Sequence, residues 1–523
     1  MAPTRPSVYA RRGVVCTSHP LAASAGLRIL QAGGNAADAA IATAACLPVL
    51  EPCSNGLGSD AFALIWDGTT LHGLNGSGRA PAAASADALR ERGLTEVPLF
   101  GWDAVTVPGM VRAWADVHAR FGRLPFADVL APAIEYAEQG ATVPPMVAWG
   151  WGRGVRAAED RLAAQPDPAC AHFAALFGPA PEVGELRAFP AMAATLRAIA
   201  DSHGEDFYSG DLATRIVTFA EQTGGLLAAS DLADHRSQWV EPISARYRDH
   251  EVWEIPPNGQ GIAALLALTI LDGLPAEQVA DWHVQVEAVK LALADTHAVV
   301  ADPDVVDVPA AELLSAAHAD RRRALIGDVA VAPDPVDPRA SDTVYLCATD
   351  DDGMMVSFIQ SNFHGFGSQV VVPDTGISLQ NRGSGFSLVP GHPNELAGGK
   401  RPFHTIIPGF LARGGEAVGP YGVMGGHMQA QGHVQVALHT VDGRLDPQAA
   451  LDRPRWFWDA ATGRVLVEDT ADPAVVASLR ERGHDVAIAE HPAVFGRGQA
   501  IWRTAGGYVA GSESRADGVP MGW

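Results

Sequence analysis

The hydrophobic pattern changes at Thr343, and this change limits the folds that the chain can adopt. From Thr343 onward, apolar residues alternate in TVYLCATD and again in MMVSFIQS, with Asp351-Asp352-Gly353 between the two runs. Alternation on both sides of a short polar turn predicts a β-hairpin. The stretch before it, VAPDPVDP at 331–338, is too rich in proline for a helix or an inner strand. We therefore predict an exposed linker between a mainly helical part and a sheet-rich part.

The part of the chain before the linker contains several segments with helical spacing. Ser18 is placed to cap a helix over 19–32, which Gly33-Gly34 would end. Asn35 is placed to cap the next helix, and Pro48 is expected to end it. Further helices are predicted over 109–121, 127–139, 259–271 and 282–300. Helices followed by strands are typical of the α+β class.

Composition and charge indicate a globular protein that binds neither nucleic acid nor membranes. Of 523 residues, 47% are hydrophobic and 19% are charged, which is ordinary usage for a folded protein. The formal net charge of −23, without any Lys/Arg-rich run, is expected to repel nucleic acid and anionic membranes. The longest apolar run, AALLALTIL at 263–271, is much shorter than the roughly 20 residues that span a bilayer.

The compartment is predicted from the N-terminal segment and the cysteines. The first residues, MAPTRPSVYARRGVVCTSHP, contain arginines but no apolar stretch of the length that a secretory signal needs. The five cysteines form no CxxC pair, and their odd number suits free thiols in a reducing compartment. We therefore expect a cytoplasmic protein without a structural zinc site.

The common catalytic and cofactor-binding motifs do not occur in the sequence. It contains no G-x-S-x-G, H-E-x-x-H, P-loop or EF-hand pattern. Gly56-Leu57-Gly58 and Gly365-Phe366-Gly367 lack the strand-to-helix setting of a dinucleotide site, so loop geometry is the better interpretation of both. Neither a cofactor nor a metal is predicted.

Thr343 is the candidate nucleophile, because it opens a strand directly after the exposed linker. Its hydroxyl could attack the carbonyl of Asp342, shift that acyl group from nitrogen to oxygen, and leave a free α-amine on Thr343 once water has cleaved the ester. An α-amine with a pKa of about 8 can accept the hydroxyl proton, so one residue supplies both nucleophile and base. Threonine is also common at the start of a strand, and this plainer interpretation stays open.

Ordered blocks of sequence extend over most of the chain: TSHPLAASAGLRILQAGGNAAD at 17–38, EPCSNGLGSDAFAL at 51–64, 107–140, 256–261, EAVKLALAD at 287–295, and 343 to about 426. Together they resemble the γ-glutamyltransferase family, whose members are self-cleaving enzymes with an N-terminal threonine nucleophile. The resemblance implies a four-layer αββα sandwich of the N-terminal nucleophile hydrolase type. It also implies that cleavage between Asp342 and Thr343 yields a large chain, 1–342, and a small chain, 343–523, interleaved in one fold.

The same resemblance assigns roles to residues around the nucleophile. Gly425-Gly426, in YGVMGGH, matches the glycine pair whose N–H groups form the oxyanion hole, with a plain tight turn as the alternative. Ser361 matches a hydroxyl residue that hydrogen-bonds the nucleophile, and Asn362 matches a substrate-binding asparagine within one position. Arg79, in NGSGRAP, matches the arginine that binds a substrate carboxylate, with a surface salt bridge as the alternative.

Departures from the family pattern bear on the substrate. The paired aspartates that bind a substrate amino group are replaced in LQNRGSGFSL by Asn381 and Arg382, which disfavour an ammonium group and favour a second anion. The family's serine pair is replaced by His404-Thr405, where His404 is either a substrate contact or a hydrogen-bonded wall. Val344-Tyr345 stand where a threonine and a histidine usually follow the nucleophile. These replacements resemble the γ-glutamyltransferase-like branch that includes oxamate amidohydrolase.

The resemblance therefore implies an enzyme that cleaves a small carboxylate-bearing amide, γ-glutamyl or related, through an acyl-Thr343 ester. Hydrolysis is expected, and acyl transfer is left open. One alternative is an oxamate-amidohydrolase-like or other acyl-amide hydrolase without γ-glutamyl transfer, and a second is an unprocessed, non-catalytic binding protein. The expected partners are the amide substrate and the two cleavage products for each other, with association of whole copies left open.

Overall fold

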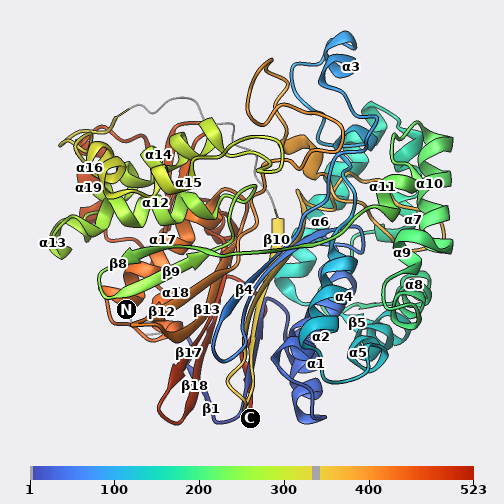
Figure 1. Cartoon of the computed structure of the whole chain (residues 1–523), viewed down its shortest axis with the longest axis horizontal. Helices are drawn as coiled ribbons and strands as arrows, with labels where there is room; N and C mark the ends of the chain where they lie inside the picture. The colour runs from blue at the N-terminus through green and yellow to red at the C-terminus, as the bar shows by residue number, and fades with distance from the viewer. Residues whose placement is uncertain (1–3, 332–341) are drawn as a thin grey trace.

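Two central β-sheets, each covered by helices on its outer face, build the four layers of the fold (Figure 1). The structure is a computed structural model that describes residues 4–331 and 342–523. The β13 sheet consists, in spatial order, of β1 (Val8–Ala10), β18 (Gly507–Ser512), β17 (Arg497–Thr504), β13 (Glu416–Met424), β12 (Gly409–Arg413), β9 (His250–Glu254) and β8 (Ile243–Tyr247). The β10 sheet consists of β19 (Met521–Gly522), β2 (Val14–Thr17), β10 (Asp342–Thr349), β11 (Met355–Phe363), β3 (Asp60–Trp66), β4 (Leu71–Gly76) and β7 (Gln238–Val240). The predicted αββα sandwich is confirmed.

The helical layers lie on opposite sides of the two sheets in Figure 1. The β10 sheet is covered by α1 (Pro20–Gln31), α2 (Ala36–Leu50), α4 (Met110–Phe121) and α5 (Phe126–Gln139), with α6 (Pro145–Ala164), α8 (Pro190–Asp201) and α10 (Asp211–Thr223) further out. The β13 sheet is covered by α12 (Gly261–Asp272), α14 (Trp282–Val299) and α17 (Met428–Val441), with α16 (Ala316–Arg323) and α19 (Pro473–Glu481) nearby. A small sheet of β14 (Trp456–Asp459), β15 (Arg464–Val467) and β16 (Val486–Ile488) extends this side.

Between the two sheets lies an apolar core that includes Phe62, Tyr345, Ile359, Phe410 and Ile501. The side chains come from strands of both sheets, so the interface is sealed by alternating residues that face inward. Groups at the ends of β10 and β13 therefore meet at the rim of a rigid, water-excluding interface.

The hairpin predicted after Thr343 is confirmed by antiparallel pairing of β10 with β11. The hairpin is not a separate sheet, because β2 pairs with β10 and β3 pairs with β11. The part before the linker is thus less purely helical than its sequence indicates, since it supplies strands to both sheets. The linker predicted at 331–338 lies, apart from Val331, outside the described residues.

The helix boundaries agree with the predictions to within two residues for α4, α5, α12 and α14. Two details differ. The N-cap of α1 is His19, whose side chain accepts the Leu21 N–H, and not Ser18. Helix α2 does not end at Pro48 but continues to Leu50. Proline lacks the N–H that would bind the carbonyl of Ala44, and that carbonyl accepts the side-chain amide of Gln360 at 2.9 Å instead.

Other expectations concern the cysteines, the Gly-x-Gly segments and membrane spans. All five cysteines are buried free thiols, as predicted. Both Gly-x-Gly segments lie in loops, as expected. Within residues 4–331 and 342–523, no helix has the length and apolar character needed to cross a bilayer.

Candidate active site

Thr343 lies at an irregularity in the pairing of β10 with β11. The two strands shift register between Asp342 and Val344. Such a bulge turns a side chain away from the regular pleat and is frequent beside active sites. Thr343 is fully buried, and its Oγ1 donates to Ser361 Oγ at 3.1 Å. The structure therefore brings together the candidate nucleophile and the hydroxyl residue predicted to contact it.

A second side chain reaches Thr343 from the first turn of α17. Gln429 Nε2 donates to Thr343 Oγ1 at 3.4 Å, and Gln429 Oε1 accepts the Ile407 N–H at 3.0 Å. The backbone contact fixes which end of the amide faces Thr343. Sequence reasoning missed Gln429, although it lies three residues after Gly426 at the start of a helix.

The glycine pair Gly425-Gly426 connects the end of β13 to α17. The φ angles are +135° and +61°, in the region that favours glycine, and a Cβ on Gly425 would lie 3.0 Å from the Cα of Gly496. The Gly426 carbonyl accepts Gln260 Nε2 at 2.9 Å, which holds the turn in place. Among hydrogen bonds between described residues, none uses the N–H of either glycine. These two N–H groups are free to bind an oxyanion.

His404 and Asp60 form a fully buried pair, with His404 Nε2 3.2 Å from Asp60 Oδ2. The other oxygen of Asp60 accepts the N–H groups of Gly78 and Gly109, both at 3.1 Å. Burial raises the pKa of Asp60 to about 7 and lowers the pKa of His404 well below its ordinary value. Asp60 is paired with Ser361 in the β3–β11 register, and directly paired residues share one face of a sheet. The His404–Asp60 pair therefore lies beside the Thr343 group.

Asp60 was not selected from the sequence. Its signal was an acidic residue, in GLGSDAFAL, at the start of an otherwise apolar strand. A buried carboxyl at such a position needs hydrogen-bond donors that come from elsewhere in the chain.

Arg382 is a buried cation with unused donors. Its Nη1 donates to Thr405 Oγ1 at 2.8 Å, and its guanidinium lies 4.3 Å from the centroid of the Phe363 ring. Its Nε and Nη2 have no hydrogen-bond partner within the part of the chain that the structure describes. Burial lowers the pKa of Arg382 to about 9, and the charge of Asp60 opposes this shift. Two buried, unpaired N–H donors on one guanidinium suit an anionic ligand.

The two predicted asparagines differ in how much of the side-chain amide is in use. Asn362 Oδ1 accepts Ser59 Oγ at 2.9 Å, whereas its Nδ2 has no partner among the described residues. Asn381 Oδ1 accepts the His364 N–H at 3.0 Å, and its Nδ2 donates to the Leu99 carbonyl at 3.0 Å. Asn362 thus has a free donor, while the Asn381 amide joins two loops.

Arg79 binds two aspartates in this structure. Its Nη1 donates to Asp302 at 2.8 Å and to the Gly399 carbonyl at 2.9 Å, and its Nη2 donates to Asp304 at 2.5 Å. The N–H of Gly78, the residue before Arg79, donates to Asp60. Arg79 therefore directly follows a backbone contact of the His404–Asp60 pair. The salt bridge considered as the alternative is present, and the role of Arg79 toward a substrate stays a prediction.

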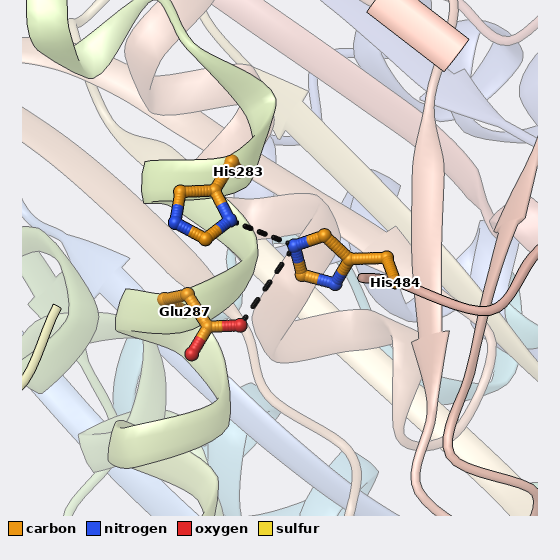
Figure 2. Close-up of side chains that lie close together, drawn as sticks. All are labelled: His283, Glu287 and His484. Carbon is orange, nitrogen blue, oxygen red and sulfur yellow. Dashed lines mark hydrogen bonds and ion pairs between the residues drawn. The ribbon is translucent and has the colours of Figure 1, made fainter. Parts of the chain in front are cut away.

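One buried group has the ligand types of a metal site. Figure 2 shows His283 and Glu287, one turn apart on α14, facing His484, with all ligand atoms within 4.8 Å of one another. His283 Nδ1 lies 2.8 Å from His484 Nε2, and Lys290 Nζ donates to Glu287 Oε1 at 2.7 Å. The ligand atoms thus already have hydrogen-bond partners, and an ammonium stands next to the carboxylate. A buried ion-pair network accounts for this group.

Comparison with known proteins shows similarity over the entire length of the chain. The chain is 38% identical to the glutathione hydrolase-like YwrD proenzyme of Bacillus subtilis strain 168, with 99% of each chain covered. It is 35% identical to the oxamate amidohydrolase proenzyme of Klebsiella pneumoniae, with 98% of each covered. The crystal structure of cephalosporin acylase from Bacillus halodurans is 50% identical and matches with a TM-score of 0.95 over 100% of this chain and 98% of that one.

The family model of gamma-glutamyltranspeptidase matches residues 22–523, on both sides of Thr343. A match of this extent includes every strand of the β10 sheet except β2, and it includes Thr343, Ser361 and the glycine pair. The chain belongs to the gamma-glutamyltranspeptidase family.

Proposed function

We propose that this chain is an amidohydrolase of the N-terminal nucleophile type and that Thr343 is its nucleophile. The observation that carries the proposal is the hydrogen bond from Thr343 Oγ1 to Ser361 Oγ, 3.1 Å long, at a buried bulge. Gly425-Gly426 and Gln429 complete the group around the hydroxyl. The similar proteins from Bacillus subtilis and Klebsiella pneumoniae are proenzymes, which supports cleavage of this chain as well.

Self-cleavage is proposed between Asp342 and Thr343. Thr343 Oγ1 adds to the carbonyl carbon of Asp342, and its proton passes to the Thr343 nitrogen, so that the amide becomes an ester. Water then hydrolyses the ester and leaves a carboxylate on Asp342 and a free α-amine on Thr343. The products are residues 1–342 and 343–523. Because β2 and β3 pair with β10 and β11, the two products share one sheet and stay together.

The liberated α-amine then serves as the base for amide cleavage. It takes the proton from Thr343 Oγ1 as that oxygen attacks the substrate carbonyl, and it gives the proton to the departing amine. The N–H groups of Gly425 and Gly426 receive the oxyanion, and each such donor typically lowers the barrier by about 2.7–4 kcal/mol. Ser361 holds the nucleophile in one orientation. Water hydrolyses the acyl-Thr343 ester, and an amine acceptor in place of water gives acyl transfer.

The proposed substrate is a small amide whose acyl part carries a carboxylate. Arg382 supports this proposal because its Nε and Nη2 are buried donors without a partner among the described residues. Thr405 orients the guanidinium through its hydroxyl, and Asn362 Nδ2 is a further free donor. Arg79 is proposed as a second carboxylate-binding group, with His404 and Asn381 shaping the walls of the site. γ-Glutamyl amides meet the requirement for a carboxylate.

Acyl-amide hydrolysis without γ-glutamyl transfer is the second candidate. A buried guanidinium at Arg382 disfavours the α-ammonium group of a γ-glutamyl substrate through like-charge repulsion. The names of the relatives, oxamate amidohydrolase and cephalosporin acylase, favour acyl groups without an ammonium. Glutaryl and oxamate-like amides fit this description.

A matched panel of amides tests the substrate proposal. It contains glutaryl anilide, its methyl ester, γ-glutamyl anilide and oxamate, each with and without a dipeptide acceptor. Glutaryl anilide is expected to exceed its ester in kcat/KM by about tenfold or more, because only the free acid pairs with a guanidinium. Equal kcat/KM for acid and ester would refute carboxylate recognition. A chain that stays uncut and cleaves no amide would favour the alternative that this chain is an unprocessed, non-catalytic binding protein.

A further inference from the structure

The glycine pair beside Thr343 packs against a third glycine from a distant part of the chain. We call Gly425-Gly426 the glycine turn. Gly496 directly precedes β17, and the register of β13 with β17 pairs the next residue, Arg497, with Met424. A Cβ on Gly425 would lie 3.0 Å from the Cα of Gly496. The backbones of these two glycines are therefore in direct contact, with no room for a side chain between them.

Gly496 has no space for a side chain of its own. Its φ of +71° lies in the left-handed region, and a Cβ would lie 2.5 Å from the Met424 carbonyl oxygen and 2.7 Å from Val423 Cγ1. Both distances are far shorter than van der Waals contact. The Met424 carbonyl and the Gly425 N–H belong to one planar peptide group. Displacement of that carbonyl oxygen therefore also reorients the Gly425 N–H.

A buried ion pair holds the backbone around Gly496. Arg455 Nη1 donates to the Phe495 carbonyl at 3.0 Å and to the Gly496 carbonyl at 3.4 Å. Arg455 Nη2 lies 2.8 Å from Glu513 Oε2, which also accepts the Gly498 N–H at 3.0 Å. Both charged side chains are fully buried. Charged groups that are buried and hydrogen-bonded have few alternative positions. The Arg455–Glu513 pair thus fixes the chain before and after Gly496.

We propose that Gly496 and the Arg455–Glu513 pair are positioning residues, which hold the Met424–Gly425 peptide so that the Gly425 N–H is aimed at the oxyanion. The inference rests on the proposed function and deepens it, since it names the residues that keep the glycine turn in its working geometry. An oxyanion donor is effective because it is in place before the charge develops. Loss of this support is therefore expected to weaken binding of the transition state and to leave binding of the ground state nearly unchanged.

Gly496→Ala and Gly463→Ala form a matched pair of variants. Both glycines have a φ of +71°, so alanine introduces a similar backbone strain at the two positions. Gly463 lies in the exposed turn between β14 and β15, and a Cβ there would meet no atom of the described residues within 4 Å. Only Gly496→Ala places the new methyl group against the Met424 carbonyl. A difference between the variants therefore reports this contact and not the strain.

The test is calorimetric titration of each processed protein with 4-boronobutanoate and with glutarate. The boronate has the carboxylate chain of glutarate and a boronic acid at the other end. Its boron accepts an electron pair from Thr343 Oγ1, the hydroxyl proton passes to the Thr343 α-amine, and a boron-bound oxygen takes the position of the oxyanion. Glutarate forms no such adduct. The measured quantity is the boronate ratio, defined as the Kd of the boronate divided by the Kd of glutarate.

Gly496→Ala is expected to raise the boronate ratio about tenfold or more, because the tetrahedral adduct needs the aimed N–H and glutarate does not. The kcat for the amide that the wild type cleaves fastest should fall by a similar factor, with KM close to the wild-type value. Gly463→Ala should keep the wild-type values of the boronate ratio, kcat and KM. A purely structural role of Gly496 would lower the yield of folded protein without changing the boronate ratio.

A second pair of variants alters the ion pair and leaves Gly496 in place. Arg455→Lys keeps a positive charge beside Glu513 and loses the planar fork that reaches two carbonyls. Arg323→Lys is its control, because Arg323 also donates to two backbone carbonyls, those of α12, at 2.7 and 3.0 Å. Arg455→Lys should raise the boronate ratio about threefold, and Arg323→Lys should leave it unchanged. This pair tests the proposal even if Gly496→Ala does not fold.

Several results would overturn the proposal. An unchanged boronate ratio in Gly496→Ala, or in Arg455→Lys if the alanine variant does not fold, would show that the residue supports the fold alone. Equal losses of boronate and glutarate affinity would show general damage to the site. A wild type that binds the boronate no more tightly than glutarate would refute the oxyanion role of the glycine turn itself. That last result, unlike the others, is seen without any variant, so failure of the proposed function is distinguished from failure of this inference.

Discussion

Thr343 Oγ1 and Ser361 Oγ are joined by a 3.1 Å hydrogen bond across the β10–β11 hairpin, at the point where the two strands shift register. Ser361 Oγ also accepts the Phe363 N–H at 2.7 Å, so the backbone fixes the position of this hydroxyl. A fixed partner limits the rotamers of Thr343 and aims its Oγ1 in one direction.

Removal of this contact is expected to slow chemistry without weakening substrate binding. Ser361→Ala should lower kcat for amide hydrolysis by about tenfold, the equivalent of one hydrogen bond of about 1.4 kcal/mol, with KM nearly unchanged. Initial rates of the processed enzyme measure both constants. Ser357→Ala is the control, because Ser357 lies on the same face of β11 and bonds the Tyr345 hydroxyl at 2.7 Å instead. Equal losses in the two variants would contradict a specific role for Ser361.

Loss of the Arg382 guanidinium is expected to weaken binding of anionic substrates alone. Arg382→Gln should raise KM for glutaryl anilide by about ten- to a hundredfold and leave KM for its methyl ester close to the wild-type value. The comparison of acid and ester within one variant separates loss of charge recognition from general damage to the fold. A parallel rise for both substrates would count against the assignment.

The acidity of Arg382 gives a pH dependence to anion binding. Burial lowers the pKa of Arg382 to about 9, so the guanidinium carries its charge below this pH and loses it above. The inhibition constant of glutarate should therefore rise as the pH passes 9. In Arg382→Gln this rise should be absent, and a rise of the same size in both proteins would show that another group is responsible.

Asp60 is expected to make the stability of the fold depend on pH. With its pKa raised to about 7, Asp60 keeps a proton in the folded protein between about pH 4 and pH 7, where the unfolded chain has lost it. The contribution of this group to the free energy of unfolding is complete below pH 4, falls as the pH rises to 7, and no longer changes above pH 7. The wild-type melting temperature relative to that of Asp60→Asn should therefore decrease from pH 4 to pH 7. A constant difference across this range would refute the raised pKa.

Local patterns allowed much of the fold to be predicted. The hairpin followed from alternation around Asp351-Asp352-Gly353, and α4, α5, α12 and α14 followed from apolar spacing. These features depend on residues that are near each other in the sequence. Pro48 misled the prediction of α2, because the group that satisfies the Ala44 carbonyl is Gln360, more than three hundred residues away.

The candidate site was predictable only where a local pattern or a family motif marked it. Thr343 was marked by its place at the start of a strand after the linker, and Ser361 and the glycine pair were marked by family motifs. Asp60 and Gln429 were missed, because they reach the Thr343 group through strand pairing and through the start of α17. The partners of Arg79 were equally hidden, since Asp302 and Asp304 are more than two hundred residues further along the chain.

The mass of the purified protein under denaturing conditions, measured for the wild type and for Thr343→Ala, decides whether Thr343 is the nucleophile. The wild type is expected to give two polypeptides, one ending at Asp342 and the other beginning at Thr343, and to hydrolyse amides. Thr343→Ala is expected to give one uncut, inactive chain. A wild-type protein that remains one continuous polypeptide and still hydrolyses amides would contradict the assignment of Thr343.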